Sequence, residues 1–187
     1  SIDVNGADAL EILWCSENQL TSLDVTQNTA LTQLACYNNQ LTSLDVTQNT
    51  NLAVLICNGN QLTSLDVTQN IALTQLGCSE NQLTSLNVSQ NIALTQLGCD
   101  NNQLTNLDVT QNTALELLYC VDNQLICLNV KNGNNSNMVD SSFIANNNPN
   151  LTCIEVDDVA YSTANWTDID AGASFSTACN NPCVLGV

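Results

Sequence analysis

The stretch from Leu31 to Asn51, LTQLACYNNQLTSLDVTQNTN, recurs along most of the chain with a period of 21 residues. Copies that align without a gap begin at Leu10, Leu31, Leu52, Leu73, Leu94 and Leu115. One position is always cysteine, at Cys15, Cys36, Cys57, Cys78, Cys99 and Cys120, and another is always asparagine, at Asn18, Asn39, Asn60, Asn81, Asn102 and Asn123. A fixed period of this kind is typical of a solenoid, in which successive turns of chain stack on one another.

Each copy divides into two similar halves, LxxLxCxxN and LxxLDVxxN. The alternation of apolar and polar residues in each half predicts a short strand. The asparagine that follows predicts a turn, because its amide can bond to backbone groups left unpaired where the chain bends. A second column of asparagines supports this reading, at Asn28, Asn49, Asn70, Asn91 and Asn112. We therefore expect two short parallel strands and two turns in each coil, with leucine, valine and cysteine inside and coils about 4.8 Å apart.

The repeat resembles that of bacterial leucine-rich repeat proteins of the IRREKO class, whose 21-residue pattern is LxxLxCxxNxLxxLDLxxN. The resemblance covers about residues 10–130. This chain departs from the pattern in having valine for the second leucine of LDL, and Asn87 and Asn129 stand in place of its aspartate. Membership of such a class implies a surface or extracellular protein, often one module of a longer chain, that acts by binding and not by catalysis.

We expect residues 1–135 to form the leucine-rich repeat solenoid, with six full units from Leu10 and a partial unit before them. Residues 136–187 are expected to hold an insertion, a last half-repeat at 151–156 and an irregular C-terminal cap. Within the insertion a short helix is predicted over 138–144. The predicted fold class is a β-solenoid with little helix, capped because an open end would expose the core and an unpaired strand edge.

The charge is strongly negative, with 18 acidic residues against one basic residue, Lys131. Nucleic acids and anionic membranes are bound through Lys and Arg, so neither is an expected partner. No apolar run is long enough for membrane insertion. Histidine is absent, and with it the commonest general base and metal ligand. Phosphate-binding glycine loops, GxSxG and Cys–His pairs are also missing from the sequence, so we predict no enzyme.

The ten cysteines fall into two groups. The six repeat cysteines are predicted to be buried free thiols, and a line of ligands does not suit a tetrahedral metal site. The other four are predicted to form disulfides, Cys127 with Cys153 across the insertion and Cys179 with Cys183 within ACNNPC; the alternative is that all ten are reduced. Disulfides indicate an oxidising compartment, so we expect a secreted or cell-surface protein.

Function is expected where the copies differ while the scaffold stays the same. In the first half the outward positions vary most, and large exposed apolar groups there are typical of an interaction surface. The alternative is that the aromatic residues of the end units merely cover the core. The predicted partner-binding residues are Trp14, Ser16, Tyr37, Ile56, Asn58, Asp100, Tyr119 and Val121.

The second half, LTSLDVTQN, is almost unvarying and carries an acidic ladder at Asp24, Asp45, Asp66, Asn87, Asp108 and Asn129. We interpret it as a solvated face that discourages sheet association. Weaker alternatives are calcium, which prefers oxygen ligands, and ice binding through the Thr and Asp side chains. No other cofactor is expected.

The sequence thus predicts an extracellular recognition module that binds a protein or a polysaccharide through its variable face. The main alternative is a structural spacer or stalk that holds other domains apart. An uncapped N-terminal strand edge would also permit edge-to-edge self-association.

Overall fold

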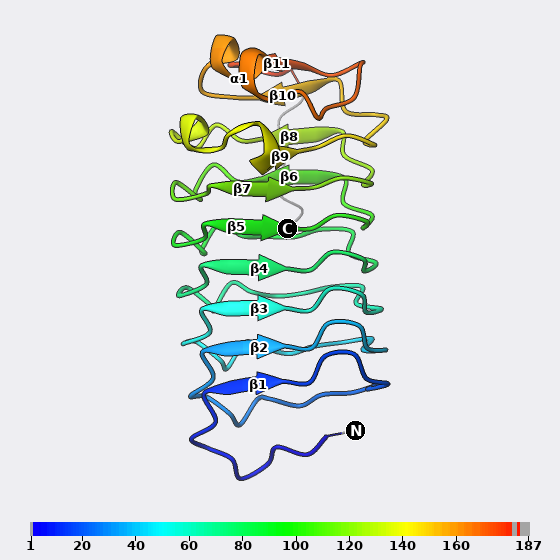
Figure 1. Ribbon diagram of the computed structural model, residues 1–187, viewed down its shortest axis with the longest axis vertical. Coiled ribbons are helices and arrows are strands. Elements are labelled where there is room, and N and C mark those ends of the chain that lie inside the picture. Colours follow the sequence, from blue (N-terminus) through cyan, green and yellow to red (C-terminus); the bar gives the residue numbers. More distant parts are fainter. Residues whose placement is uncertain (1, 181–182, 184–187) are drawn as a thin grey trace.

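The computed structural model describes residues 2–180 and 183, and these form a stack of parallel coils (Figure 1). The first halves of the coils build a seven-stranded parallel sheet, here the first-half sheet. Its strands are, in spatial order, β1 (Ile12–Trp14), β2 (Gln33–Ala35), β3 (Val54–Ile56), β4 (Gln75–Gly77), β5 (Gln96–Gly98), β7 (Leu117–Tyr119) and β9 (Phe143–Ile144). From β1 to β7 each strand pairs with the next at a shift of 21 residues, as Leu13 with Leu34, which confirms the predicted leucine-rich repeat solenoid.

Inside the stack lies one continuous core of leucine, valine and cysteine. In each strand of the first-half sheet from β1 to β7 the middle leucine is buried, because successive side chains of a strand point to opposite faces. The six repeat cysteines are buried free thiols, as predicted. Burial raises the pKa of the Cys78 thiol to about 12, since the thiolate would lose its water. These thiols are therefore held in their unreactive, protonated form.

The two asparagine columns bond the coils together in different ways. In the first, Asn60 donates its amide N–H groups to the carbonyls of Cys36 and Cys57 at 3.1 and 3.0 Å, and its Oδ1 accepts the N–H of Leu41 at 3.0 Å. In the second, Asn70 donates to the carbonyls of Val46 and Asn49. Here the amide oxygen is buried and has no hydrogen-bond partner, and the same holds for three other members of the column, Asn49, Asn91 and Asn112. Both columns do bond backbone groups at the turns, as expected.

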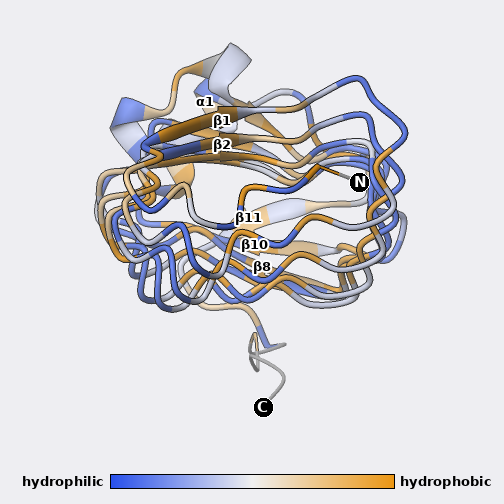
Figure 2. Cartoon of the chain, turned by 90° about the horizontal axis from the view of Figure 1, so that it is seen from below, coloured by the Kyte–Doolittle hydropathy of each residue, from blue (hydrophilic) through white to orange (hydrophobic). Residues whose placement is uncertain are grey.

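The second halves depart from the prediction of two strands per coil. Their sheet, here the second-half sheet, has four strands at the C-terminal end of the stack, in the order β11 (Ser174–Ser176), β10 (Cys153–Glu155), β8 (Cys127–Asn129) and β6 (Asn106–Asp108). Viewed along the stack, β8, β10 and β11 lie on the side opposite β1 and β2 (Figure 2). In the four coils before β6 the second half carries no strand. The aspartate of these coils bonds to its own turn, as Asp45 Oδ1 accepts the N–H and the hydroxyl of Thr47 at 3.0 and 2.7 Å. Asp108 of β6 likewise accepts the N–H of Thr110 at 2.9 Å.

The partial unit at the N-terminus lies in phase with the repeats. Asn28 donates its amide to the carbonyls of Val4 and Ala7, which are the bonds that Asn49 makes one coil later to Val25 and Asn28.

The helix predicted over 138–144 is wrong in kind and extent. Two 3₁₀ turns, Asn135–Asn137 and Asp140–Ser142, occupy this insertion, and Phe143–Ile144 forms β9, which adds to the first-half sheet beside β7. Phe143 and Ala145 are buried, as the inward residues of the repeats are, so burial overrides the local helical pattern.

The cap contains one helix, α1 (Val159–Asn165), which begins with Asp158 accepting the N–H groups of Ala160 and Tyr161. Trp166 follows it and is buried against Phe143, with ring centroids 4.1 Å apart, and donates its indole N–H to the carbonyl of Met138. These aromatic contacts join the insertion to the cap. Among the described residues no helix has the length and apolar character required to cross a membrane.

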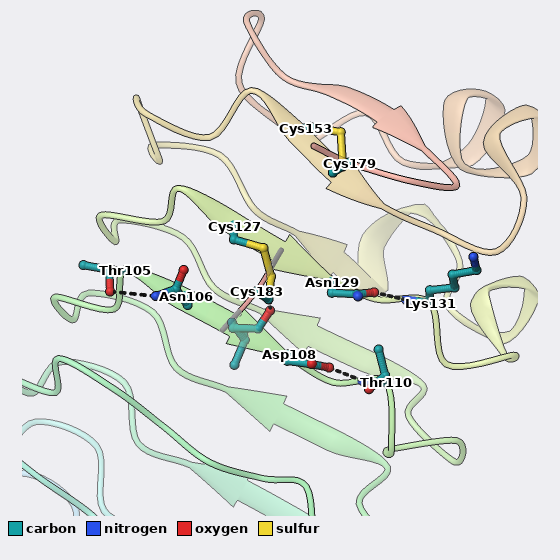
Figure 3. The surroundings of a disulfide bond; sticks show 11 residues. Thr105, Asn106, Asp108, Thr110, Cys127, Asn129, Lys131, Cys153, Cys179 and Cys183 are labelled. Carbon is teal, nitrogen blue, oxygen red and sulfur yellow. Dashed lines mark hydrogen bonds between the residues drawn. A yellow bond between two sulfur atoms is a disulfide. The ribbon is translucent and has the colours of Figure 1, made fainter. Parts of the chain in front are cut away.

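The disulfides join the C-terminal segment to the second-half sheet, as Cys127–Cys183 and Cys153–Cys179 (Figure 3). The pairing predicted from sequence, Cys127 with Cys153 and Cys179 with Cys183, is therefore wrong. Leu128 pairs with Ile154, so Cys127 and Cys153 do lie on neighbouring strands. Side chains at such positions of parallel strands point the same way, and each sulfur is met by one from the segment that lies over the sheet. The final residues of the predicted cap, 184–187, lie outside the described part.

Candidate partner-binding face

The outward side chains of the first-half sheet form two columns that the strand register brings side by side. Each three-residue strand buries its middle residue and directs the first and third outward. One outward column is Ile12, Gln33, Val54, Gln75, Gln96 and Leu117, and the other is Trp14, Ala35, Ile56, Gly77, Gly98 and Tyr119. The predicted site residues Trp14, Ile56 and Tyr119 therefore share one face, here the variable face.

The N-terminal end of the variable face is its most apolar part. Trp14 is 74% exposed and Ile12 46% exposed. Beside Trp14 lies a depression of about 420 Å³, lined by Trp14, Ser16, Glu17, Ala35 and Tyr37. Three of the predicted site residues, Trp14, Ser16 and Tyr37, thus surround one hollow, here the Trp14–Tyr37 depression. The hydroxyl oxygen of Ser16 is buried and has no hydrogen-bond partner.

The residue that directly follows each repeat cysteine forms a third column, and hydrogen bonds within this column join successive coils. Asn58 Oδ1 accepts the N–H of Ser79 at 2.9 Å, and Asp100 Oδ1 accepts the N–H of Val121 at 3.0 Å. Between them the Ser79 hydroxyl donates to Asp100 Oδ2 at 3.0 Å. Asn58, Asp100 and Val121 were predicted from their variability to contact a partner, and the structure gives each of them a hydrogen bond within the stack.

Asp100 supplies the one carboxylate of this column, and it is partly buried. Burial raises its pKa above the ordinary value, although the hydrogen bonds from Val121 and Ser79 act in the opposite direction. The brace also explains a glycine in the outward column, because a Cβ on Gly77 would lie 2.9 Å from Asn58 Oδ1. Gly98 has more room, since the nearest atom, Ser79 Oγ, would lie 3.4 Å away.

Tyr119, at the other end of the variable face, is tied to the insertion. Its hydroxyl donates to the carbonyl of Ser141 at 2.9 Å, and its ring is partly buried. It is thus less accessible to a partner than Trp14. Tyr37 and Ile56 are also partly buried.

Sequence reasoning missed a row of left-handed residues at the turn after the first-half strands. Glu17, Asn38, Glu80, Asn101 and Asp122 have φ between 51° and 56°, and Gly59 has φ 62°. Asparagine and glycine adopt this conformation readily, whereas glutamate does so at a cost. The recurrence of Asn, Gly and Asp at this position was the signal that could have revealed it. The turn fixes where each of these side chains leaves the backbone at the rim of the variable face.

Three carboxyl groups of the acidic ladder in the second halves have lowered pKa values, whereas the pKa of Asp100 is raised. Hydrogen bonds from Thr26, Thr47 and Thr68 lower the pKa of Asp24, Asp45 and Asp66. Shallow depressions of about 260 and 280 Å³ separate successive coils here, the first lined by Ser43, Leu44, Asp45, Thr47, Ser64 and Asp66. In the part of the chain that the structure describes, no group of three or more acidic, cysteine or histidine side chains is arranged to hold a metal ion.

Comparison with known proteins gives matches among solved structures. No protein-family model matches the chain, and no curated protein does. The functional domain of InlJ from Listeria monocytogenes, which includes a cysteine ladder, is 35% identical over 83% of this chain, with a TM-score of 0.71. An internalin, InlF, from the same species is 21% identical over 92% of the chain, with a TM-score of 0.61. A leucine-rich repeat protein of Leptospira interrogans is 24% identical over 89% of the chain, also with a TM-score of 0.61. At these identities the two matches are informative about the fold alone. The chain spans 37%, 48% and 43% of these three proteins.

Proposed function

Since this chain is a bacterial-type leucine-rich repeat protein of 21-residue units with buried cysteine and asparagine ladders, a non-enzymatic fold, we propose that it recognises an extracellular protein or polysaccharide through its variable face. The observation that carries the proposal is Trp14, a large aromatic side chain left 74% exposed on a sheet whose scaffold repeats almost unchanged. Exposed aromatic residues are expensive to keep in water and are enriched among the residues that dominate binding energy.

Two further features support recognition by this face over the other. The outward columns of the first-half sheet change from coil to coil, while the second halves repeat one sequence, LTSLDVTQN, with few changes. The first-half sheet is also continuous over seven strands, so its outward side chains are held at fixed spacing. A rigid surface loses little conformational freedom on binding.

A secreted or cell-surface location fits the same evidence. The chain has two disulfides. Such bonds persist in an oxidising compartment and are rare in the reducing cytosol. The likeness to the functional domain of InlJ supports a role in contact with other molecules, with the partner left to experiment.

The test is a screen of the purified chain against immobilised extracellular proteins and glycans, followed by affinity measurement on each hit. A variant with Trp14→Ala, Tyr37→Ala and Ile56→Ala is expected to bind at least about tenfold more weakly, because such positions carry a large share of binding energy. Tyr119 is left unchanged because its loss would disturb the insertion. The matched control carries Asp24→Asn, Asp45→Asn and Asp66→Asn, a change that the chain itself tolerates at Asn87.

Unchanged binding by the variable-face variant would overturn the proposal. Loss of binding by the aspartate variant alone would assign recognition to the second halves instead. A chain that binds nothing in the screen would favour the alternative, a structural spacer that holds other domains apart.

A further inference from the structure

We propose that the Trp14–Tyr37 depression takes a cationic side chain, best filled by arginine, from a basic protein partner. The inference rests on the proposed function of the variable face and names the chemistry of one anchor within it. It is carried by the side chains that line the depression and by the charge of the whole molecule.

Aromatic rings and a carboxylate meet in this depression. Trp14 and Tyr37 lie on adjacent coils, and Glu17 lines the depression with them. The backbone N–H of Glu17 donates to the carbonyl of Tyr37 at 2.9 Å, which fixes the glutamate beside the tyrosine. The face of an aromatic ring attracts a cation, tryptophan most strongly, and the planar guanidinium group also stacks on such rings.

The polar groups of the depression are suited to a donor. The carboxylate of Glu17 accepts hydrogen bonds and cannot donate them when ionised. The hydroxyl groups of Ser16 and Tyr37 can donate as well as accept, so the Glu17 carboxylate is the lining side chain that only accepts. A guanidinium carries five N–H donors and no acceptor, so it can bond to the carboxylate while its plane stacks on the aromatic rings.

The field of the molecule favours the same class of partner. The net charge is −17, and the sole basic residue of the sequence, Lys131, lies toward the opposite end of the stack, where its Nζ donates to the carbonyl of Thr177. Glu80 and Asp122 occupy the same position as Glu17 in later coils, along the rim of the variable face. A surface of one sign accelerates encounter with a partner of the other sign and disfavours acidic ones.

The experiment follows the indole N–H signals by ¹H–¹⁵N NMR while small probes are added to the whole chain. The probes are N-acetylarginine amide, its neutral analogue N-acetylcitrulline amide, and methyl β-glucoside. We expect the arginine probe to shift the Trp14 signal in a saturable manner and the other two to leave it unmoved. Trp166 is the internal reference, because it is buried and its indole N–H is bonded to Met138.

Two matched substitutions separate a site from general attraction. Glu17→Gln and Asp45→Asn each remove one negative charge, the first at the depression and the second on the opposite face. We expect Glu17→Gln to lower the affinity for the arginine probe about threefold. Asp45→Asn should change this affinity by less than half as much. Trp14→Ala is expected to weaken binding of the arginine probe about fivefold, because it removes a partly exposed cation–π contact. Since this variant lacks the Trp14 indole, its binding is measured from the Tyr37 ring signals.

Citrulline or glucoside shifts as large as those of arginine would overturn the inference, as would equal effects of the two charge substitutions. Its failure is distinguishable from failure of the proposed function. Without an arginine response, a variable-face variant that still loses partner binding would reject the cationic anchor alone. With an arginine response, a variable-face variant that binds its partner unchanged would reject the proposed function and keep the cation site.

Discussion

The two halves of one repeat share a sequence pattern but are stabilised in different ways. The first halves join in a ladder from β1 to β9, and their asparagines use both ends of the amide. The second halves begin to pair only at β6, although the aspartate bonds to its own turn both before β6, as at Asp45, and within it, as at Asp108. Four of their asparagines keep a buried oxygen without a partner. Hydrophobic periodicity therefore fixes which residues are buried, whereas hydrogen bonding decides which half is a sheet.

The second halves form strands where the C-terminal segment, of which residues 177–180 and 183 are described, is linked to them. Cys183 and Cys179 join that segment to β8 and β10, and the Lys131 ammonium group bonds to the same segment at Thr177. At the matching position the earlier coils have serine, as at Ser43 and Ser64, and no covalent link. The covalent links thus coincide with the part of the second face that is paired as a sheet.

The largest expected effect is reduction of these two disulfides. They close loops with sequence separations of 56 and 26 residues, and the chain-entropy model gives about 3–4 kcal/mol for each. Treatment with a phosphine reductant should lower protection from hydrogen exchange at β8, β10 and β11 and leave β2 to β4 unchanged. The repeat cysteines are a built-in control, because their buried thiols should not react with a thiol reagent in the native state. Equal loss of protection along the whole stack would show that the two ends are not stabilised separately.

A second comparison removes one asparagine from each column. Asn81→Ala leaves the Leu62 N–H without its partner and takes a donor from the carbonyls of Cys57 and Cys78, so we expect a loss of about 3 kcal/mol in the free energy of unfolding. Asn91→Ala should cost about 1 kcal/mol. The carbonyls it bonds, those of Val67 and Asn70, also accept backbone N–H groups, and its own unpaired oxygen is removed with it. Urea unfolding of both variants measures the difference, and equal costs would contradict the distinction between the columns.

A smaller effect is expected at the left-handed turn. Glu80 has φ 55°, a conformation that Asn38 and Asn101 adopt at the same position of other coils. Glu80→Asn should raise the free energy of unfolding by about 0.5 kcal/mol, because asparagine tolerates this backbone better. Glu80→Gln removes the same charge and keeps the poor backbone preference, so it should give no such gain. A gain shared by both variants would assign the effect to charge.

The sequence predicted most of the fold because the pattern is repeated. Period, core, cysteine ladder and outward columns all follow from which residue types recur, and one copy supports the next. Prediction failed where the chain is not repeated or where contacts are distant. The partner of Cys127 is Cys183, which is 56 residues away in the sequence, and Phe143 forms a strand because it is buried under Trp166. Of the candidate site, the column positions were foreseen, but the bracing bonds of Asn58 and Asp100 depend on atomic distances that variability does not reveal.

The smallest expected effect concerns pH, and it should have opposite signs on the two faces. Burial raises the pKa of Asp100, so the stability linked to that group is present at low pH and is lost as the pH rises through its raised folded value. The pKa of Asp45 is lowered by its hydrogen bonds from Thr47, so its contribution is present above the unfolded value and is lost as the pH falls through the folded one. The stability of Asp100→Asn relative to the native chain should therefore be higher at pH 7 than at pH 3. The relative stability of Asp45→Asn should be lower at pH 7 than at pH 3. Urea midpoints at both pH values in low salt measure the two trends, and parallel trends would mean that total charge, and not the setting of each carboxylate, controls stability.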